Sequence, residues 1–441
     1  MTRTRFAPSP TGYLHIGALR TAAYAYALAK HDQGQFILRI EDTDQKREIP
    51  GGTQKIYDTL GKFLTWDETL LQSDRAKQGV YREAALKLVE SGHAFYCDCQ
   101  PRNAKTEGYS LILRDPCREK KLTSGAIKLK VPDGEKIKFY DFVLKKEVEF
   151  DSDQVTDTIL LKSDGTFPTY HLAVVVDDHF QHISHVMRGP EWITSTPIHI
   201  LVHRYLRYDL PQIGHLTVIL DPQGGKLSKR KDNVAIEDFL AKGYLPEALL
   251  NFVILLGWAP KDNRELFTLN EFVQEFDING FQKSNPKLDL KKLDWFNGHY
   301  LRQKSDAQLL ELIKPRLDYE ASDAKLLQIL PLVKDRTTTL VDMIALMKFF
   351  FVAPAPQDVD RQHIQAAKEA LEKVAWNKTD IESQLLEKVR QQGWKNGDFF
   401  MSLRLAICGS RITPPLTESL LILGKAEVLS RLSHYAQQTS T

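Results

Sequence analysis

The N-terminal stretch RFAPSPTGYLHIGA, residues 5–18, joins a short apolar segment to an alanine-rich one. Its two prolines and Gly12 favour a tight turn. The residues up to Phe6 have the pattern of a strand, Gly17–Lys30 that of a helix, and Phe36–Ile40 that of a second, buried strand. Strand, helix and strand in this order predict an α/β fold with a parallel sheet.

The turn itself has the chemistry of an anion site. A helix that starts directly after it points free N–H groups and the positive end of its dipole toward a bound phosphate. His15 can donate a hydrogen bond to oxygens that gain charge as diphosphate leaves. Gly17 leaves room for a ligand to approach the backbone. A Pro/Gly loop with a surface histidine is the alternative, because short motifs often occur by chance.

A second basic motif, KLSKR at residues 226–230, follows the turn-forming sequence DPQGG at 221–225. Lys226, Lys229 and Arg230 place three cations on one loop, which could close over phosphates. The alternative is an ordinary solvated charge run.

In the remainder of the chain the sequence pattern changes twice. Residues 97–157 are charged and rich in turns, with short strands expected at Ala126–Val131 and Lys145–Phe150, so they look like an insertion. Buried strands are then expected at Leu172–Val176 and His185–Arg188, before a helix at Pro197–Tyr208.

Beyond Ser305 the pattern is helical, and Thr379 with Glu382 fits a capping box. The amphipathic segments are 306–317, 323–334, 338–350, 363–374, 380–391, 398–407 and 416–436.

Composition limits the classes of function. The 441 residues suggest about three or four domains. Lys+Arg 59 against Asp+Glu 57 gives a net charge of +2, so any RNA contact must come from local patches. There is no apolar run near the ~20 residues of a membrane span and no signal peptide, so we expect a cytoplasmic protein without a membrane role. Four cysteines are too few for a disulfide framework, which favours a reducing compartment.

Taken together, the HIG turn and KLSKR resemble the HIGH and KMSKR signatures of class I aminoacyl-tRNA synthetases, with Ala18 for the last histidine and Leu227 for methionine. Other segments are similar to those of bacterial-type glutamyl-tRNA synthetases and extend the resemblance over nearly the whole chain. They are FILRIEDTD (36–44), FPTYHLAVVVDDH (167–179), HVMRGPEW (185–192), GYLPEALLNFVILLGW (243–258), KLDWFNGHY (292–300) and LRLAICG (403–409).

The resemblance implies a four-part architecture. A Rossmann-type parallel-sheet catalytic domain is split between residues 1–90 and 168–222. An α+β insertion at 91–167 binds the acceptor stem, and a stem-contact domain with the KLSKR loop spans 223–305. An all-α anticodon-binding region follows at 306–441.

It also implies a reaction. L-glutamate is ligated to tRNA(Glu) through a glutamyl-adenylate, with ATP used as its Mg²⁺ complex and AMP and diphosphate released. We expect a monomer. His15, Gly17, Lys226 and Lys229 are the implied catalytic residues. The implied ATP contacts are Pro8, Thr11, His15, Gly17, Ala18, Lys226, Leu227, Ser228, Lys229 and Arg230.

Six residues are implied to line the glutamate pocket: Arg5, Ser9, Glu41, Tyr170, Arg188 and Trp192. The chemistry suits the ligand. A γ-carboxylate pairs with a planar guanidinium, so Arg5 and Arg188 are candidates, and an α-ammonium needs an acceptor such as Glu41. Tyr170 can close the pocket and donate through its hydroxyl. Each could instead be a structural ion pair or core aromatic.

Cys97, Cys99 and Cys117 resemble the zinc-binding cysteines of the family's insertion. Zinc takes four ligands, and Tyr109, eight positions before Cys117, or Glu119, two after it, could supply the fourth, although the spacing departs from the family's pattern. Three inert thiols are the alternative. We do not interpret His199 and His203, or the nearby histidines, as a metal site, because no HExxH glutamate accompanies them.

Two further hypotheses concern RNA and ligand contacts. Asp177, Asp178 and His179 are expected to end a buried strand and to contact ATP or the acceptor end. Lys283, Lys287, Lys291 and Lys292 could meet tRNA phosphates, or could equally be a solvated basic helix end.

Other functions remain open. A paralogue could charge tRNA(Gln) with glutamate, and glutaminyl-tRNA synthetase or the enzyme that glutamylates queuosine share the chemistry. The helical C-terminal third opposes the last two. A non-catalytic tRNA-binding relative is disfavoured by the intact His15, Gly17, Lys226 and Lys229. A nucleotidylyltransferase would lack the pocket segments.

Overall fold

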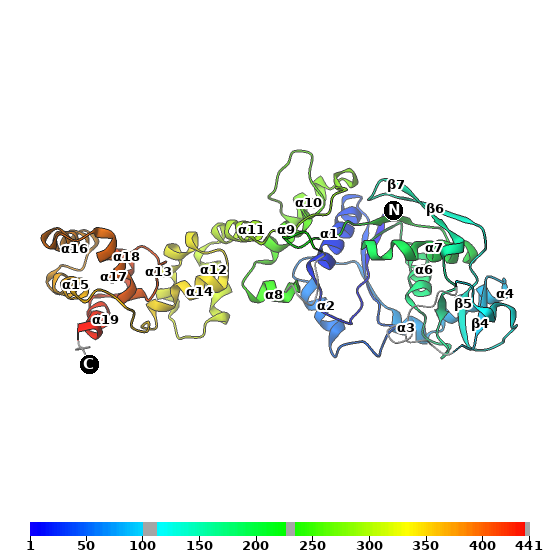
Figure 1. The fold of residues 1–441 in the computed structure, drawn as a ribbon, viewed down its shortest axis with the longest axis horizontal. Helices are drawn as coiled ribbons and strands as arrows, with labels where there is room; N and C mark the ends of the chain where they lie inside the picture. Colours follow the sequence, from blue (N-terminus) through cyan, green and yellow to red (C-terminus); the bar gives the residue numbers. More distant parts are fainter. Residues whose placement is uncertain (100–112, 226–233, 437–441) are drawn as a thin grey trace. The chain divides into compact units, whose positions relative to one another are not determined.

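The computed structural model describes residues 1–99, 113–225 and 234–436, and their elements are labelled in Figure 1. The chain forms two compact units. Residues Met1–Leu240 and Leu249–Leu290 make up the first, here called the α/β unit. Residues Ala241–Ala248 and Lys291–Thr441 make up the second, the helical unit. None of the described helices is both long and apolar enough to cross a membrane.

A seven-stranded sheet forms the centre of the α/β unit, in the order β3-β2-β1-β9-β10-β6-β7. Neighbouring strands are parallel except for β6 and β7, which are antiparallel. The predicted α/β fold with a parallel sheet is confirmed. The strands are β1 Arg3–Phe6, β2 Gln35–Ile40, β3 Glu68–Leu71, β6 Lys136–Asp141, β7 Lys146–Asp151, β9 His185–Arg188 and β10 Gln212–His215.

The strand order reverses direction beside β1. The chain passes from β1 outward to β2 and β3, and later returns to place β9 and β10 on the other side of β1. In open α/β sheets a ligand binds outside the carboxyl ends of the strands at such a switch point. The fold therefore directs attention to the residues that follow β1, β2 and β9.

The helices of the α/β unit lie between residues 16 and 275. The helix α1 runs from Ile16 to His31, and its alanine-rich sequence lets it be buried on most sides. The others are α2 Gly52–Leu60, α3 Gln72–Lys77, α4 Val80–Glu90, α6 Tyr170–Phe180, α7 Thr196–Leu206, α8 Ile236–Ala241, α9 Pro246–Ile254 and α10 Leu269–Glu275.

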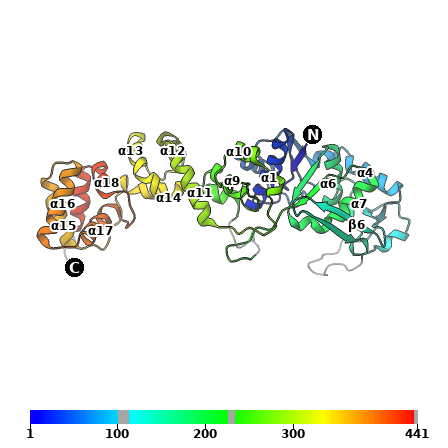
Figure 2. The same cartoon turned by 90° about the horizontal axis from the view of Figure 1, so that it is seen from above.

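The strand predicted at Leu172–Val176 is wrong, because these residues lie within helix α6. Their five side chains are all buried, so the segment lacks the polar positions that would reveal a helical period. The three valines in it favour a strand by propensity, and burial overrides that preference. Helix α6 packs against α4 and α7, as two views show (Figures 1 and 2).

The predicted insertion divides between two sheets. Strands β4 Ala94–Cys97, β5 Ala126–Leu129 and β8 Ile159–Leu161 form a separate antiparallel sheet. The hairpin of β6 and β7 instead extends the main sheet, where Asp141 pairs with Ile213 of β10. The strands predicted at Ala126–Val131 and Lys145–Phe150 correspond to β5 and β7.

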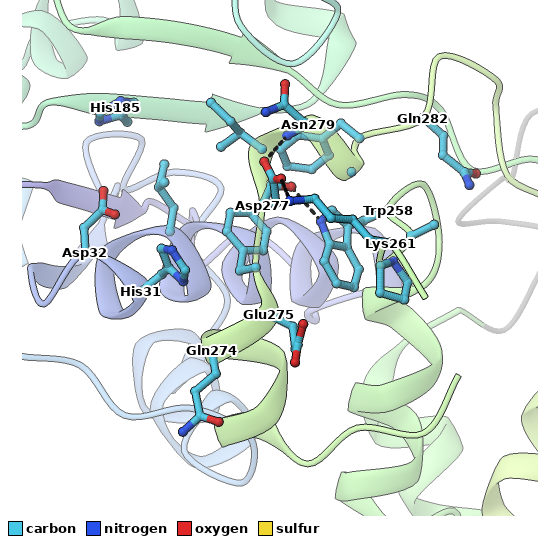
Figure 3. Close-up of a pocket in the computed structure, with 17 residues that line it drawn as sticks. His31, Asp32, His185, Trp258, Lys261, Gln274, Glu275, Asp277, Asn279 and Gln282 are labelled. Atoms are coloured by element: carbon cyan, nitrogen blue, oxygen red, sulfur yellow. Dashed lines mark hydrogen bonds and ion pairs between the residues drawn. The ribbon is translucent and has the colours of Figure 1, made fainter. Parts of the chain in front are cut away.

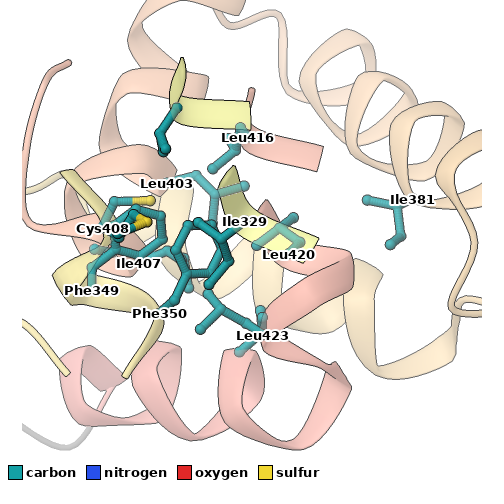
Figure 4. Packing of buried hydrophobic residues seen from close by; sticks show 14 of the residues in the cluster. Ile329, Phe349, Phe350, Ile381, Leu403, Ile407, Cys408, Leu416, Leu420 and Leu423 are labelled. Carbon is teal, nitrogen blue, oxygen red and sulfur yellow. The ribbon is translucent and has the colours of Figure 1, made fainter. Parts of the chain in front are cut away.

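The helical unit confirms the all-α C-terminal region. Its core contains Phe349, Phe350, Leu403 and Ile407, whose side chains Figure 4 shows grouped between helices. The helices are α11 Leu290–Gln303, α12 Asp306–Ile313, α13 Asp323–Val333, α14 Leu340–Met347, α15 Arg361–Lys373, α16 Lys378–Gln392, α17 Asn396–Cys408, α18 Leu416–Leu423 and α19 Lys425–Ala436.

Two details of this region were predicted wrongly. The expected helix 416–436 is two helices separated by Gly424, whose φ of 85° only glycine adopts readily. The cap of α16 is Asn377, which accepts from the Asp380 N–H, so Thr379 is not the capping residue. Asparagine competes well for this role because its side chain reaches the third N–H of the helix.

Candidate active site

The turn after β1 ends at the start of α1, and His15 caps this helix. The His15 Nδ1 accepts a hydrogen bond from the Ala18 N–H at 3.2 Å. Because Nδ1 is an acceptor, a neutral His15 carries its proton on Nε2. The ring is therefore held at the helix N-terminus, where anions bind.

Gly17 is required by the position of this ring. A Cβ at residue 17 would lie 3.1 Å from both Cε1 and Nδ1 of His15. This separation is tighter than ordinary van der Waals contact, so a side chain at residue 17 would displace the imidazole by a few tenths of an ångström. The order His-Ile-Gly thus has a steric cause that the sequence alone did not reveal.

A short chain pairing connects this turn with the residues after the KLSKR motif. The Ile16 N–H donates to Val234 O at 3.1 Å, and the Ile236 N–H donates to Leu14 O at 2.9 Å. Lys226, Leu227, Ser228, Lys229 and Arg230 lie outside the described residues. The segment that follows them is nevertheless bonded directly to both neighbours of His15.

Residues from several strands meet at the carboxyl edge of the sheet. Glu41 directly follows β2, and Arg188 and His215 are the last residues of β9 and β10. The Glu41 N–H donates to Pro8 O at 2.9 Å, which joins the end of β2 to the turn after β1. This is the position at which the switch-point rule places a ligand.

Arg5 is buried and forms an ion pair. Its Nε and Nη2 donate to the two carboxylate oxygens of Asp178 at 3.0 and 3.4 Å. Arg39 donates to the same carboxylate. Burial alone would raise the pKa of Asp178, but Arg5 and Arg39 outweigh that effect and hold it at about 2.

Asp177, Asp178 and His179 therefore do not end a strand, contrary to the prediction, but lie in α6. Asp177 is fully buried and accepts from Gln72, Arg75 and Tyr81. The two acidic side chains hold neighbouring elements together, and Asp178 also reaches the site through Arg5.

Glu41 has a carboxyl group with a raised pKa. Its Oε1 is buried and has no hydrogen-bond partner among the residues that the structure describes. Burial raises its pKa to about 7, while Arg39 and Arg5 act in the opposite direction. A buried acceptor without a partner is costly, so this oxygen is suited to a donor that arrives with the ligand.

Arg188 is buried, and its guanidinium is surrounded by neutral groups. Its terminal nitrogens contact His199 Nδ1 at 2.9 Å, Thr196 Oγ1 at 2.8 Å, the Tyr170 hydroxyl at 3.3 Å and Trp192 O at 3.4 Å. Its Nε donates to His215 Nε2 at 3.0 Å. Among the described residues no carboxylate forms an ion pair with it, so its positive charge is uncompensated.

The neighbouring histidines do not add charge. Burial lowers the pKa of His199 well below its usual value and that of His171 to about 4, with Arg188 acting in the same direction. Both rings are neutral near pH 7 and lie 3.3 Å apart between Nδ1 of His171 and Nε2 of His199.

The remaining predicted pocket residues are distributed as follows. The Tyr170 and Trp192 rings lie 4.0 Å apart between centroids, beside Arg188. Arg5, Glu41 and Arg188 all act electrostatically on Tyr170. Ser9 is exposed, whereas Pro8 is buried and Thr11 and Ala18 are half-buried. The structure thus brings together five of the six pocket residues: Arg5, Glu41, Tyr170, Arg188 and Trp192.

The cysteine cluster has a fourth member that the sequence analysis missed. Ligand atoms of Cys97, Cys99, Cys117 and Asp115 lie within 4.8 Å of one another. The Asp115 carboxylate also accepts from the Cys117 N–H at 2.8 Å and pairs with Lys128. Glu119 is exposed and outside this group, and Tyr109 lies outside the described residues.

A hollow of about 770 Å³ lies elsewhere in the α/β unit. Figure 3 shows Trp258, Lys261 and Asn279 gathered around Asp277, which bonds or pairs with each of them. The lining includes His185, the first residue of β9, so the hollow lies at the amino end of that strand. Ligands of such sheets bind at the opposite edge, and this hollow is not the active site.

Comparison with known proteins agrees with this geometry. Residues 1–295 match the model of the catalytic domain of class I tRNA synthetases (E and Q), and residues 308–436 match an anticodon binding domain. The fold and the site are those of a class I aminoacyl-tRNA synthetase. Within that class, the chain belongs to the family of tRNA synthetases for glutamate and glutamine, denoted E and Q.

Curated relatives span the whole chain. The chain is 36% identical to a glutamate–tRNA ligase of Finegoldia magna, with 98% of each chain covered. It is 37% identical to that of Nitratidesulfovibrio vulgaris, with 97% of this chain and 98% of the relative covered. The structure of a glutamate tRNA ligase from Elizabethkingia meningosepticum, in complex with its amino acid, superimposes with a TM-score of 0.84 at 31% identity and 99% coverage of both chains.

Proposed function

We infer that the protein ligates L-glutamate to tRNA(Glu) with ATP. One observation carries the inference: in the described parts of the chain, buried Arg188 has no ion-pair partner and Glu41 Oε1 has no hydrogen-bond partner, and both residues lie at the same sheet edge as the His15-capped start of α1. An amino acid with an acidic side chain carries the complementary groups, a carboxylate and an ammonium.

In the proposed complex, the γ-carboxylate binds Arg188. It takes over the two longest contacts of the guanidinium, those to the Tyr170 hydroxyl and Trp192 O, which involve one terminal nitrogen each. The Tyr170 hydroxyl can then donate to the same carboxylate. The α-ammonium is held by Glu41, whose buried oxygen gains a donor. Ser9 and Arg5 line the remainder of the pocket.

ATP is proposed to place its phosphates against the N-terminus of α1, next to Pro8, Thr11, Gly17 and Ala18. A carboxylate oxygen of glutamate attacks the α-phosphorus, the bond to the bridging oxygen breaks, and diphosphate leaves with Mg²⁺. The Nε2–H of His15 and the cations Lys226, Lys229 and Arg230 would stabilise the charge that develops. The terminal ribose hydroxyl of the tRNA then attacks the glutamyl carbonyl and releases AMP.

The four-part division of the chain stays a proposal. We assign residues 1–90 and 168–222 to catalysis, 91–167 to the acceptor stem, 223–305 to the stem contact and 306–441 to the anticodon. The gap between the two family models, from 295 to 308, supports the last boundary. Lys283, Lys287, Lys291 and Lys292 are candidates for phosphate contacts.

We also propose structural zinc at Cys97, Cys99, Cys117 and Asp115. Three thiolates and a carboxylate are a suitable tetrahedral set, in which ligand atoms lie roughly 3.3–3.8 Å apart around the ion. The Cys99 and Cys117 sulfurs are 3.4 Å apart, and Cys97 Sγ is 3.5 Å from Asp115. Elemental analysis should find one zinc per chain, reduced in Asp115→Ala and unchanged in Glu119→Ala. Full zinc content in Asp115→Ala would exclude the carboxylate.

The decisive experiment is aminoacylation of purified tRNA(Glu) and tRNA(Gln) in parallel, with glutamate and with glutamine. We expect glutamate on tRNA(Glu) only. Glutamate on tRNA(Gln) would favour the broader paralogue, and charging of neither tRNA would contradict the enzymatic function. Glutamate-dependent exchange of ATP and diphosphate is expected to require tRNA, and a full rate without RNA would refute that requirement.

A further inference from the structure

We propose that Asp141 and His215 act as a positioning pair for the reaction, by fixing the orientation in which Arg188 meets the side chain of glutamate. The inference rests on the role proposed for Arg188 in glutamate binding. Neither residue has a motif in the sequence, and neither is among the pocket residues assigned above.

Asp141 is the fixed end of the pair. It is fully buried at the carboxyl end of β6, next to β10. Its Oδ1 accepts from the N–H groups of Val143 and Leu144 at 3.1 and 2.9 Å, and its Oδ2 accepts from His215 Nδ1 at 2.7 Å. Backbone donors hold one oxygen, so the other presents a fixed acceptor to the imidazole.

His215 transmits this orientation to Arg188. Its ring is fully buried, and donation from Nδ1 to Asp141 leaves a lone pair on Nε2 in the neutral tautomer. That lone pair accepts from Arg188 Nε at 3.0 Å. Together with the contacts of the terminal nitrogens to His199 and Thr196, a bond at Nε fixes the rotation of the guanidinium, whose terminal nitrogens also contact Tyr170 and Trp192.

The imidazole of His215 separates the charges of Asp141 and Arg188, and this separation favours binding of the substrate carboxylate. A carboxylate in contact with Arg188 would compete with the γ-carboxylate of the substrate for the same donors. With His215 interposed, Arg188 receives an acceptor without an adjacent anion. The arrangement orients the cation and leaves its charge for the ligand.

Two substitutions of His215 separate positioning from simple structural support. The amide of His215→Gln reaches the place of Nε2 and can still accept from Arg188, whereas the amide of His215→Asn reaches only the place of Nδ1. We expect the KM for glutamate to rise ~30-fold in His215→Asn and less than about 5-fold in His215→Gln. The KM for ATP should change less than about 2-fold in both.

Asp141→Asn provides the second measurement. It removes the anion that fixes the His215 tautomer, so we expect the KM for glutamate to rise ~10-fold with little change in kcat. The control is Asn251→Ala in the same unit, where buried Asn251 donates to Glu265 O and accepts from the Phe267 N–H, and neither partner is a predicted site residue. It should lower the Tm and leave the KM for glutamate unchanged.

A double-mutant cycle with Arg188→Lys tests whether His215 affects the KM for glutamate through Arg188. Lysine has no Nε to donate to His215, so adding His215→Asn should raise the KM for glutamate less than 3-fold further. Full additivity, or equal effects of His215→Asn and His215→Gln, would overturn the positioning pair. An unchanged KM for glutamate in Arg188→Ala would instead overturn the role of Arg188, which distinguishes the two failures.

Discussion

Two arginines at the carboxyl edge of the same sheet have opposite surroundings. Arg5 is paired with the buried carboxylate of Asp178, which Arg39 also contacts. Arg188 meets only neutral acceptors among the described residues, and the carboxylate of Asp141 is linked to it through the imidazole of His215. A paired arginine mainly stabilises the fold, whereas an uncompensated one is ready for an anionic ligand.

The difference shows that residue type alone does not define a binding role. Both arginines are buried and both follow from the same family resemblance. Their electrostatic states differ because Arg5 faces the carboxylate of Asp178 on α6. Arg188 instead faces His199 and the Thr196 hydroxyl of α7 and the Tyr170 hydroxyl of α6. We therefore expect substitutions at the two sites to affect different properties of the enzyme.

The largest effect is expected from Arg188→Ala. Loss of two charge-assisted hydrogen bonds to the γ-carboxylate should lower kcat/KM for glutamate by ~10³-fold, or about 4 kcal/mol. The measurement is tRNA-dependent exchange of diphosphate into ATP over a range of glutamate concentrations. A change of less than tenfold would show that Arg188 does not carry the side-chain recognition, and the comparison would fail.

Asp178→Asn should mainly affect stability. Removing one partner of a buried ion pair costs about 3 kcal/mol in the free energy of unfolding, because Arg5 and Arg39 lose their counter-ion. The pKa of Asp178 is depressed to about 2, so its stabilisation is complete above its ordinary value near 3.8 and is lost as pH falls toward 2.

This pH dependence can be checked by urea unfolding between pH 2 and 5. The wild type should lose stability as pH falls through this interval, and the Asp178→Asn variant should lose less. Equal slopes in the two proteins would contradict the assignment of the depressed pKa to Asp178.

The pH dependence of the KM for glutamate tests the charge state of Glu41, which lies near Arg5. Burial raises its pKa to about 7 despite Arg39 and Arg5, so the carboxyl is protonated below that pH and cannot act as an anion toward the α-ammonium. The KM for glutamate should therefore fall about tenfold as pH rises from 6 to 7.5. In Glu41→Gln the KM should be higher and nearly constant over this range. A wild-type KM that does not change with pH would contradict this.

Tyr170→Phe should give the smallest effect. The variant loses the hydroxyl, which lies 3.3 Å from Arg188 and is proposed to donate to the γ-carboxylate, and keeps the ring contact with Trp192. A net loss of roughly 1 kcal/mol corresponds to a rise of about fivefold in the KM for glutamate. A much larger rise would mean that the tyrosine, rather than the guanidinium, dominates recognition.

Local patterns were sufficient for part of the fold and site. The prolines and glycine of the turn before His15 and Gly17 mark it in the sequence, and α1 follows it as predicted. The strand Phe36–Ile40 and the helical C-terminal region were equally recognisable, because their periods are regular. Arg188 and Glu41 were identified through the family resemblance, and the structure brings them to one edge.

The parts that were missed depend on contacts between distant residues. Asp141 ends the strand KIKFYD, whose alternation of buried and exposed residues was a usable signal for β6. Its partnership with His215 spans 74 positions and leaves no local pattern. Asp115 was overlooked because only Tyr109 and Glu119 were considered as the fourth ligand, and the aspartate two positions before Cys117 was not. The helical period of α6 could not be recognised in the sequence, because every side chain of Leu172–Val176 is buried.

The hairpin of β6 and β7 also limits how the enzyme can be re-engineered. Its sequence lies within the segment that the family resemblance assigns to acceptor-stem binding, yet it extends the main sheet and delivers Asp141 to its edge. A chimaera that exchanges residues 91–167 as one cassette would exchange that support too. Grafts that retain residues 136–151 of the recipient would leave amino-acid selection intact while the RNA contacts are replaced.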